Sequence, residues 1–373
     1  MKAWPVLAIS IIQVILFAAH WLVFSTWIAF WPGLAPAAAA GLRTAMLVLA
    51  FSFVAASLLS FRYFNPAVRF VYWLAAVWLG FFNFFFWASL LAWMVWFALR
   101  LTLSPAQAAS ARPLLAGVLY AIAALVGFYG LLNARIVCIR RIAVELPNLP
   151  ASWRGRRAVL LSDLHLGPIN GVQFCRRLVA KARSFQPDVV FLPGDLFDGT
   201  KGNLDLLMAP LKQLTPPLGV YFSTGNHEEF TDPKHYIEAI TRAGIRVLGN
   251  ELVTVDGVQV AGVYYHSASS PLRMKTALDS MRLDRARPSI LLNHVPTRLP
   301  TVEQAGFNLQ LSGHTHGGQV LPFTWITNSV FGLFTKGQHH FGALQVYTST
   351  GAGTWGPPLR VGARPEVVFI TFA

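Results

Sequence analysis

The chain has 373 residues, of which 54% are hydrophobic and 12% charged, and its mean hydropathy is +0.50. This composition is too apolar for an ordinary soluble enzyme, and the length leaves room for two or three domains of roughly 100 to 200 residues each. The net charge of +14 is compatible with nucleic acid, anionic lipid or a phosphorylated substrate as partner. Two cysteines without metal-type spacing, Cys138 and Cys175, provide no disulfide framework.

The average composition conceals a division near residue 135. Six charged residues precede it, all of them basic, whereas all sixteen acidic residues lie between Glu145 and Glu366. A bilayer core of about 30 Å needs about 20 apolar residues per helix, and four stretches meet that length: residues 5–31, 42–61, 71–99 and 113–132. We therefore predict an all-α transmembrane domain of about four helices over residues 1–134. We expect His20, inside the first stretch, to be a packing residue.

Four spans place both chain termini on one side of the membrane, and basic residues predict which side. Six lie on the side of the termini and three on the other: Lys2, Arg62, Arg69, Arg135, Arg140 and Arg141 against Arg43, Arg100 and Arg112. Because positive residues concentrate in cytoplasmic loops, we expect a multi-pass protein of a bacterial inner membrane with a cytoplasmic catalytic part. The basic segment 135–156 is interpreted as a juxtamembrane linker with a first strand, which either contacts anionic headgroups or is solvated.

From residue 157 to 373, short β-branched or apolar runs alternate with amphipathic stretches. The expected strands are residues 157–161, 189–192, 220–223, 258–263, 290–293, 309–312, 344–349 and 367–372. The expected helices are residues 172–185, 204–214, 232–243, 271–281 and 297–305. This alternation predicts a layered α/β domain.

Five fragments with metal-type side chains follow the ends of these strands. They read SDLHLG at 162–167, GDLFD at 194–198, GNHEE at 225–229, NHVP at 293–296 and LSGHTHGGQ at 311–319. Because ligand sites of open α/β sheets gather at the carboxyl ends of strands, we expect the fragments to converge. Together they supply oxygen and imidazole donors without sulfur, in numbers sufficient for two divalent ions, which suits Mn, Fe, Zn, Co or Ni.

The order and wording of these fragments resemble the calcineurin-like metallophosphoesterase superfamily over about residues 146–372. The segments LPNLPASWRGRRAVLLSDLHLG and TSTGAGTWGPPLRVGARPEVVFITF resemble in particular its bacterial membrane-associated phosphodiesterase branch, some members of which carry N-terminal transmembrane helices. The resemblance implies a four-layer α/β/β/α sandwich with a dinuclear metal site, of which Mn is the favoured metal.

The resemblance also implies a role for each motif residue. The first metal would take Asp163, His165 and His316, Asp195 would bridge, and the second metal would take Asn226, His294 and His314. A metal-bridged hydroxide would be the nucleophile and His227 the proton donor to the leaving oxygen. For Glu228 we expect either fixation of the His227 tautomer or a surface role. Gly199 stands where the protein serine/threonine phosphatase branch has an arginine, which argues against phosphoprotein substrates.

The substrate signal is weaker. The apolar segment 326–334 predicts either a lip that dips into the membrane interface or a core helix, and His266, His339 and His340 are candidate substrate contacts. Our leading hypothesis is a membrane-embedded dimetal hydrolase of a phosphodiester or pyrophosphate bond, with a lipid-linked substrate, a role in lipid metabolism and no nucleic-acid partner. One alternative is a membrane-anchored phosphodiesterase for soluble nucleotides. Another is a transport or scaffold protein whose second domain only binds metal.

Overall fold

The computed structural model describes residues 3–230 and 232–373, so Lys2 lies outside the described residues. Internal contacts divide the chain into two units. The helical unit comprises residues 1–132 and 356–359, and the α/β unit comprises residues 133–355 and 360–373.

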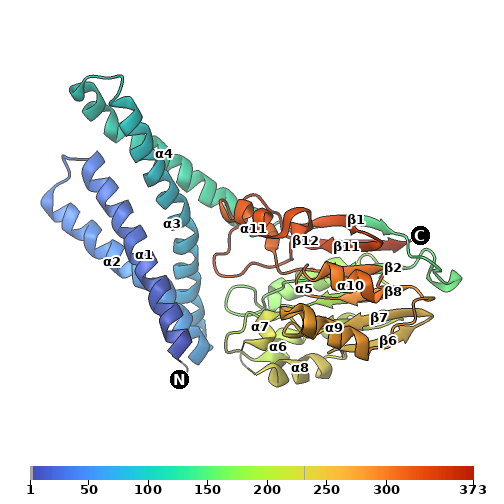
Figure 1. Ribbon diagram of the computed structural model, residues 1–373. Helices are drawn as coiled ribbons and strands as arrows, with labels where there is room; N and C mark the ends of the chain where they lie inside the picture. The colour runs from blue at the N-terminus through green and yellow to red at the C-terminus, as the bar shows by residue number, and fades with distance from the viewer. Residues whose placement is uncertain (1–2, 231) are drawn as a thin grey trace. The chain divides into compact units, whose positions relative to one another are not determined.

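Long apolar helices make up the described part of the helical unit (Figure 1). They are α1 (Ala3–Phe30), α2 (Pro36–Arg62), α3 (Pro66–Leu99) and α4 (Pro105–Asn133). All four are long and apolar enough to cross a membrane, so the four expected spans are present. Large apolar side chains such as Val14, Leu125 and Met94 remain exposed on their outer faces, where a bilayer would cover them.

Three helices begin five or more residues earlier than the hydropathy of the sequence predicts. α2 starts at Pro36, α3 at Pro66 and α4 at Pro105, so Arg43 and Arg112 lie inside helices. Proline is well suited to the first turn of a helix, because its missing N–H has no partner there in any case. At the start of α3, the Asn65 side chain accepts a hydrogen bond from Val68 N at 3.0 Å and caps the helix.

The α/β unit contains two mixed sheets. The first has the order β1-β12-β2-β3-β4-β5, and only the pair β12/β2 is antiparallel in it. Its strands are β1 (Cys138–Val144), β2 (Arg157–Leu160), β3 (Val189–Pro193), β4 (Val220–Ser223), β5 (Arg246–Val247) and β12 (Glu366–Phe372).

The second sheet has the order β10-β11-β9-β8-β7-β6, with antiparallel pairs at its two edges. Its strands are β6 (Glu251–Val255), β7 (Val258–Gly262), β8 (Ser289–Leu292), β9 (Leu309–Ser312), β10 (Gly337–Phe341) and β11 (Leu344–Thr348).

Three apolar clusters lie between four layers, as expected for an α/β/β/α sandwich. Successive residues of a strand point to opposite faces, and β3 shows the effect: Val190 and Leu192 pack towards helices, whereas Val189 and Phe191 face the other sheet. The first outer layer holds α5 (Val172–Arg183), α6 (Leu204–Met208) and α8 (Pro233–Arg242). The opposite layer holds α9 (Pro271–Ser280) and α10 (Leu299–Ala305).

The sequence pattern missed some elements. It did not predict β5, β6 or β10, which are short or lie at sheet edges, nor α11 (Phe323–Phe331) as a defined helix. α11 is not the core helix that was one expectation for this segment, since Phe323, Ile326 and Val330 are exposed.

Candidate metal centre

The functional side chains lie at the carboxyl ends of five strands from both sheets. Asp163 and His165 follow β2, Asp195 follows β3, and Asn226 begins α7 (Asn226–Glu229) after β4. The second sheet contributes three more side chains: His294 follows β8, and His314 and His316 follow β9. The convergence expected from the sequence is therefore present, although 153 positions separate Asp163 from His316.

Five of these side chains stand on a strained backbone. Their φ angles are positive, at 53° for Asp163, 46° for His165, 52° for Asp195, 69° for His314 and 49° for His316. Residues other than glycine rarely adopt this left-handed conformation. The exceptions cluster at functional sites. The positive φ angles of His314 and His316 bend the chain between them, and both rings lie in the cluster.

Glycine is required where the loops approach one another. A Cβ on Gly225 would lie 2.6 Å from the backbone nitrogen of Asp195, and a Cβ on Gly313 would lie 2.9 Å from the Cβ of Ser162. Both distances are shorter than any van der Waals contact of carbon. These two glycines let the loops of the separate strands pack closely enough to share ligands.

One group of donors combines Asp163, His165 and His316. The Nε2 atoms of His165 and His316 are 3.0 Å apart, and His316 Nε2 is 3.5 Å from Asp163 Oδ1. The Asp163 carboxylate also accepts a hydrogen bond from the His314 backbone N–H at 2.9 Å, which links this group to the next.

A second group is built around Asp195, His294 and His314. Asp195 Oδ2 is 3.2 Å from His294 Nε2. The Asn226 Oδ1 atom lies 3.2 Å from His294 Nε2 and 2.9 Å from His314 Nδ1.

Asp195 Oδ2 also faces the first group. It lies 3.8 Å from His165 Nε2 and 4.0 Å from His227 Nε2. A single carboxylate oxygen thus stands between imidazoles of both groups.

The donor set fits divalent metal ions. Two imidazole nitrogens at 3.0 Å, with a carboxylate oxygen beside them, point at a common position, and imidazole with carboxylate is a typical ligand set for Mn, Fe and Zn. His294 Nδ1 is 2.8 Å from the Pro193 carbonyl, which fixes its proton there and leaves the Nε2 lone pair for a metal. The buried Nδ1 of His165 has no hydrogen-bond partner among the described residues.

Burial and mutual charge shift the acids and imidazoles in different directions. Burial raises the pKa of Asp163 to about 6. Burial works against ionisation of Asp195 as well, but His294 and the other imidazoles hold its pKa well below the usual value. Burial lowers the pKa of His294, yet the Asp195 carboxylate overrides it and the pKa is raised to about 10. Burial lowers the pKa of His314 to about 4.

Glu228 does not take the role that the sequence suggested. Its buried carboxylate accepts backbone N–H groups from Gly225 at 2.8 Å, Asp195 at 3.0 Å and Phe197 at 3.1 Å. The tautomer of His227 is set instead by the Asp198 carbonyl, which lies 3.0 Å from its Nδ1. Glu228 therefore ties the loops that carry Asp195 and His227 together, and it is not on the surface.

Sequence reasoning also missed Arg360. Its guanidinium is fully buried and donates to the His316 carbonyl at 2.8 Å and to His316 Nδ1 at 3.0 Å. It also donates to the carbonyl of Gly353. Burial lowers the pKa of Arg360 to about 10. The sequence gives only a weak signal for this residue, an arginine in the otherwise apolar run GPPLRVG.

The other candidate histidines have partners elsewhere. His266 is exposed and its Nε2 is 2.6 Å from Arg273 Nη1, while His339 bonds to the Lys336 carbonyl and packs against Phe334. His340 is exposed on β10. Tyr265 does approach the cluster, with its ring centroid 6.3 Å from those of His294 and His314.

The site is a buried cluster of histidine and aspartate side chains at the strand ends of two mixed sheets. Such a cluster is typical of metal-dependent hydrolases. The comparisons with known proteins agree. The family model of the calcineurin-like phosphoesterases matches residues 156–318.

Relatives come from vertebrates and bacteria. The chain is 35% identical over 271 residues to the "Transmembrane protein with metallophosphoesterase domain" of Danio rerio, covering 67% of this chain and 60% of that protein. It is 32% identical over 266 residues to an uncharacterized metallophosphoesterase of Aquifex aeolicus, covering 67% of this chain and 97% of that protein. The chain thus spans less than two thirds of the Danio rerio relative.

Among solved structures, the α/β fold is similar to "GAP50 the anchor in the inner membrane complex of Plasmodium", with a TM-score of 0.35 and 12% identity over 53% of this chain and 72% of that one. The Aquifex aeolicus match, which extends over 97% of that protein at 32% identity, establishes the family, and the family model agrees with it. The chain belongs to the calcineurin-like metallophosphoesterases and joins the metal-site domain to long apolar helices.

Proposed function

We propose that this protein hydrolyses a phosphodiester or pyrophosphate bond of a lipid-linked substrate at the bilayer surface, with two divalent ions. The observation that carries the proposal is the position of Asp195 Oδ2, 3.2 Å from His294 Nε2 and 3.8 Å from His165 Nε2. In this assignment Asp195 would be the ligand shared by the two ions. The remaining ligands would be Asp163, His165 and His316 for one ion and Asn226, His294 and His314 for the other.

Two such ions, when bound, supply a water nucleophile at neutral pH and neutralise the phosphoryl oxygens. The chain's own residues prepare the site for this chemistry. The Asp195 side chain accepts the His227 backbone N–H at 3.0 Å, so the bridging residue and the candidate proton donor are held in one geometry.

His227 is suited to protonate the leaving oxygen. Its Nδ1 is held at the Asp198 carbonyl, which directs Nε2 towards Asp195. Burial lowers the pKa of His227, so its protonated form gives up a proton readily. An anionic substrate favours protonation of the ring before the bond breaks, and general acid catalysis of this kind contributes about 10² to 10⁴ fold.

The apolar rim of the centre supports a lipid-linked substrate over a soluble nucleotide. The rings of Phe230 and Trp355 lie 4.9 and 5.7 Å from the His227 ring, and both side chains are more than half exposed. On the other side, the Phe331 ring of α11 is 6.2 Å from His314. Exposed aromatic residues beside a polar catalytic group suit a substrate with a phosphate and an apolar tail.

The test compares substrates on the full chain in detergent micelles. We expect Mn²⁺-dependent hydrolysis of a phosphodiester that carries an acyl chain, at a higher kcat/KM than that of the same phosphodiester without the chain. The double substitution Phe230→Ser with Trp355→Ser should remove this preference and leave the soluble substrate's kcat unchanged. Equal kcat/KM for both substrates in the native protein would favour the nucleotide alternative, and metal binding without turnover would favour the scaffold alternative.

We also propose the finer placement that the sequence predicts. The protein would belong to the bacterial membrane-associated phosphodiesterase branch and act in lipid metabolism, with residues 1–134 in the inner membrane, 135–156 as linker and first strand, and 157–373 as the catalytic domain on the cytoplasmic side. The excess of basic residues on the side of the chain termini supports this orientation. A protease-protection assay on inverted and right-side-out vesicles tests it, since a catalytic domain cleaved only in right-side-out vesicles would reverse the orientation.

A further inference from the structure

The helical unit contains arginines but no acid with which to pair them. Arg62 lies over the Tyr63 ring at 5.9 Å and Arg69 over the Phe64 ring at 5.6 Å. Arg100 and Arg112 both lie over the Trp96 ring, at 5.0 and 4.2 Å from its centroid. These four charges are therefore accommodated by aromatic rings of the same unit.

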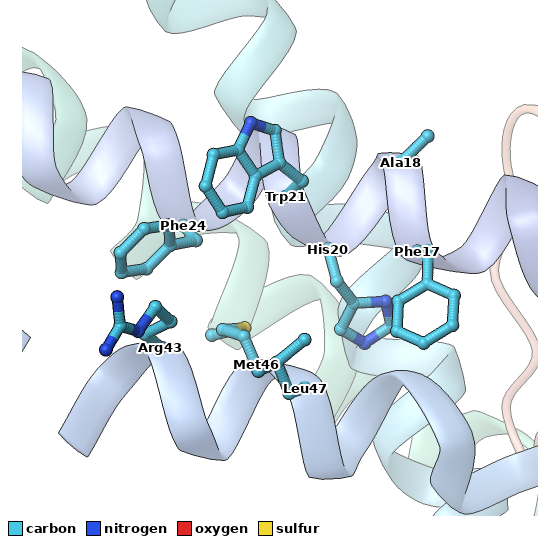
Figure 2. A pocket seen from close by; sticks show the side chains of 8 residues that line it. All are labelled: Phe17, Ala18, His20, Trp21, Phe24, Arg43, Met46 and Leu47. Carbon is cyan, nitrogen blue, oxygen red and sulfur yellow. The ribbon is translucent and has the colours of Figure 1, made fainter. Parts of the chain in front are cut away.

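Arg43 is placed differently. It lines a cavity of about 360 Å³ between α1 and α2, together with aromatic and aliphatic side chains (Figure 2). The guanidinium lies opposite Phe24, whereas Phe17 stands at the far end of the row of labelled side chains. Met46 and Leu47 line the cavity from α2, and Trp21 lines it from α1. Trp21 and Leu47 are 61% and 48% exposed, so the cavity opens on the outer surface of the helices.

The other polar residue of the cavity is already satisfied. His20 Nδ1 is 2.7 Å from the Leu16 carbonyl, to which it donates, and His20 Nε2 accepts the indole N–H of Trp78 at 3.1 Å. The imidazole also stacks on Phe82 with centroids 3.6 Å apart. A ligand in the cavity would therefore meet one cation, Arg43, and otherwise apolar walls.

We propose that this groove binds one anionic phospholipid of the bilayer, with the lipid phosphate on Arg43 and an acyl chain along Phe17, Phe24, Met46 and Leu47. Arg43 is seven residues after the start of α2, or about 10 Å along the helix at about 1.5 Å per residue, and it is the second residue of the apolar stretch 42–61. Its charge therefore lies at the end of the span, where a lipid phosphate can reach it. Because the helical unit has no acidic residue, an anion that meets this charge does not come from within the unit. A guanidinium forms two parallel hydrogen bonds to a phosphate, and the apolar walls select a phosphate that carries acyl chains over a free one. The proposal is independent of the reaction at the metal centre.

The test uses native mass spectrometry of the full-length protein, released from mixed micelles with phosphatidylglycerol and phosphatidylcholine of identical acyl chains. The native protein is expected to retain one phosphatidylglycerol. The Arg43→Gln variant should retain about fivefold less of it, which is the equilibrium ratio for about 1 kcal/mol per headgroup-facing arginine. The matched control is Arg100→Gln, which removes an arginine that lies over Trp96 and should leave the retention unchanged.

A second variant tests the contribution of the groove separately from that of the positive charge. Met46→Trp keeps Arg43 but fills the cavity, so it should displace the lipid, and it carries the test alone if Arg43→Gln does not fold. Unchanged phosphatidylglycerol retention in both variants would overturn the proposal. An equal loss of phosphatidylglycerol in the Arg100→Gln control would overturn it too. So would the mass of a protein dimer, in place of a lipid adduct, that disappears in Met46→Trp.

Discussion

Replacing Glu228 by glutamine tests how the site is held together. The carboxylate accepts three buried backbone N–H groups, with Oε2 serving Gly225 and Asp195 and Oε1 serving Phe197. Glutamine has the same shape, but its single carbonyl oxygen can replace only one carboxylate oxygen, and its NH2 group then faces an N–H donor. At least one buried N–H is left without an acceptor.

The number of N–H groups left without an acceptor determines the expected loss of stability. An unsatisfied buried donor costs about 1–3 kcal/mol, and hydrogen bonds to a charged acceptor are stronger than those to a neutral one. We expect Glu228→Gln to lower the stability of the α/β unit by about 2–3 kcal/mol. For a unit of this size, about 1 kcal/mol corresponds to about 2–4 °C in Tm, so the Tm should fall by about 4–12 °C. Because the Asp195 backbone is one of the three donors, metal affinity should fall by about 10- to 100-fold.

The assay is thermal unfolding of the metal-free full chain in detergent, followed by near-UV circular dichroism, with metal affinity measured separately by titration. Glu238→Gln is the matched control, since Glu238 is exposed on α8 and the same atoms change there. A Tm within about 2 °C of the native protein for Glu228→Gln would refute the role assigned to the three hydrogen bonds.

The other predictions concern the metals and the proton donor. Asp195→Ala should abolish hydrolysis and reduce the bound metal, measured by elemental analysis, below two ions per chain; retained full activity would contradict the bridging role. His227→Ala should lower kcat by about 10² to 10⁴ fold with the metal content unchanged, and loss of metal instead would make it a ligand. His294, with its pKa raised to about 10, is protonated in the metal-free protein at pH 7, so metal binding must release its proton. The apparent metal affinity should therefore rise by up to about tenfold per pH unit between pH 7 and 10. Calorimetry in buffers of different ionisation enthalpy measures the released proton, and a metal affinity independent of pH would refute the prediction. Arg360→Lys, which cannot reach all the acceptors of the guanidinium, should weaken metal binding through His316 while leaving the protein folded; unchanged metal affinity would show that the contact is dispensable.

The sequence alone determined the features that depend on local composition or on motif order. Long apolar stretches without acids specify the helices, because length and hydropathy are local properties. The continuous apolar run of β3 specifies a strand with two buried faces. The five motif fragments specified which side chains would meet at the strand ends. The family followed from the same fragments.

Only the tertiary structure decided which groups hold those fragments in place. β5 is a strand because it pairs with β4, where Arg246 lies opposite Tyr221, and that partner is distant in the sequence. Glu228 looks like part of a catalytic motif, but its carboxylate oxygens accept backbone N–H groups of its own loop and of the loop after β3. Arg360 reads as a surface charge in the chain and is a buried donor to His316 in the fold. Hydrogen bonds between residues distant in sequence depend on the tertiary fold, which is fixed by packing over the whole unit.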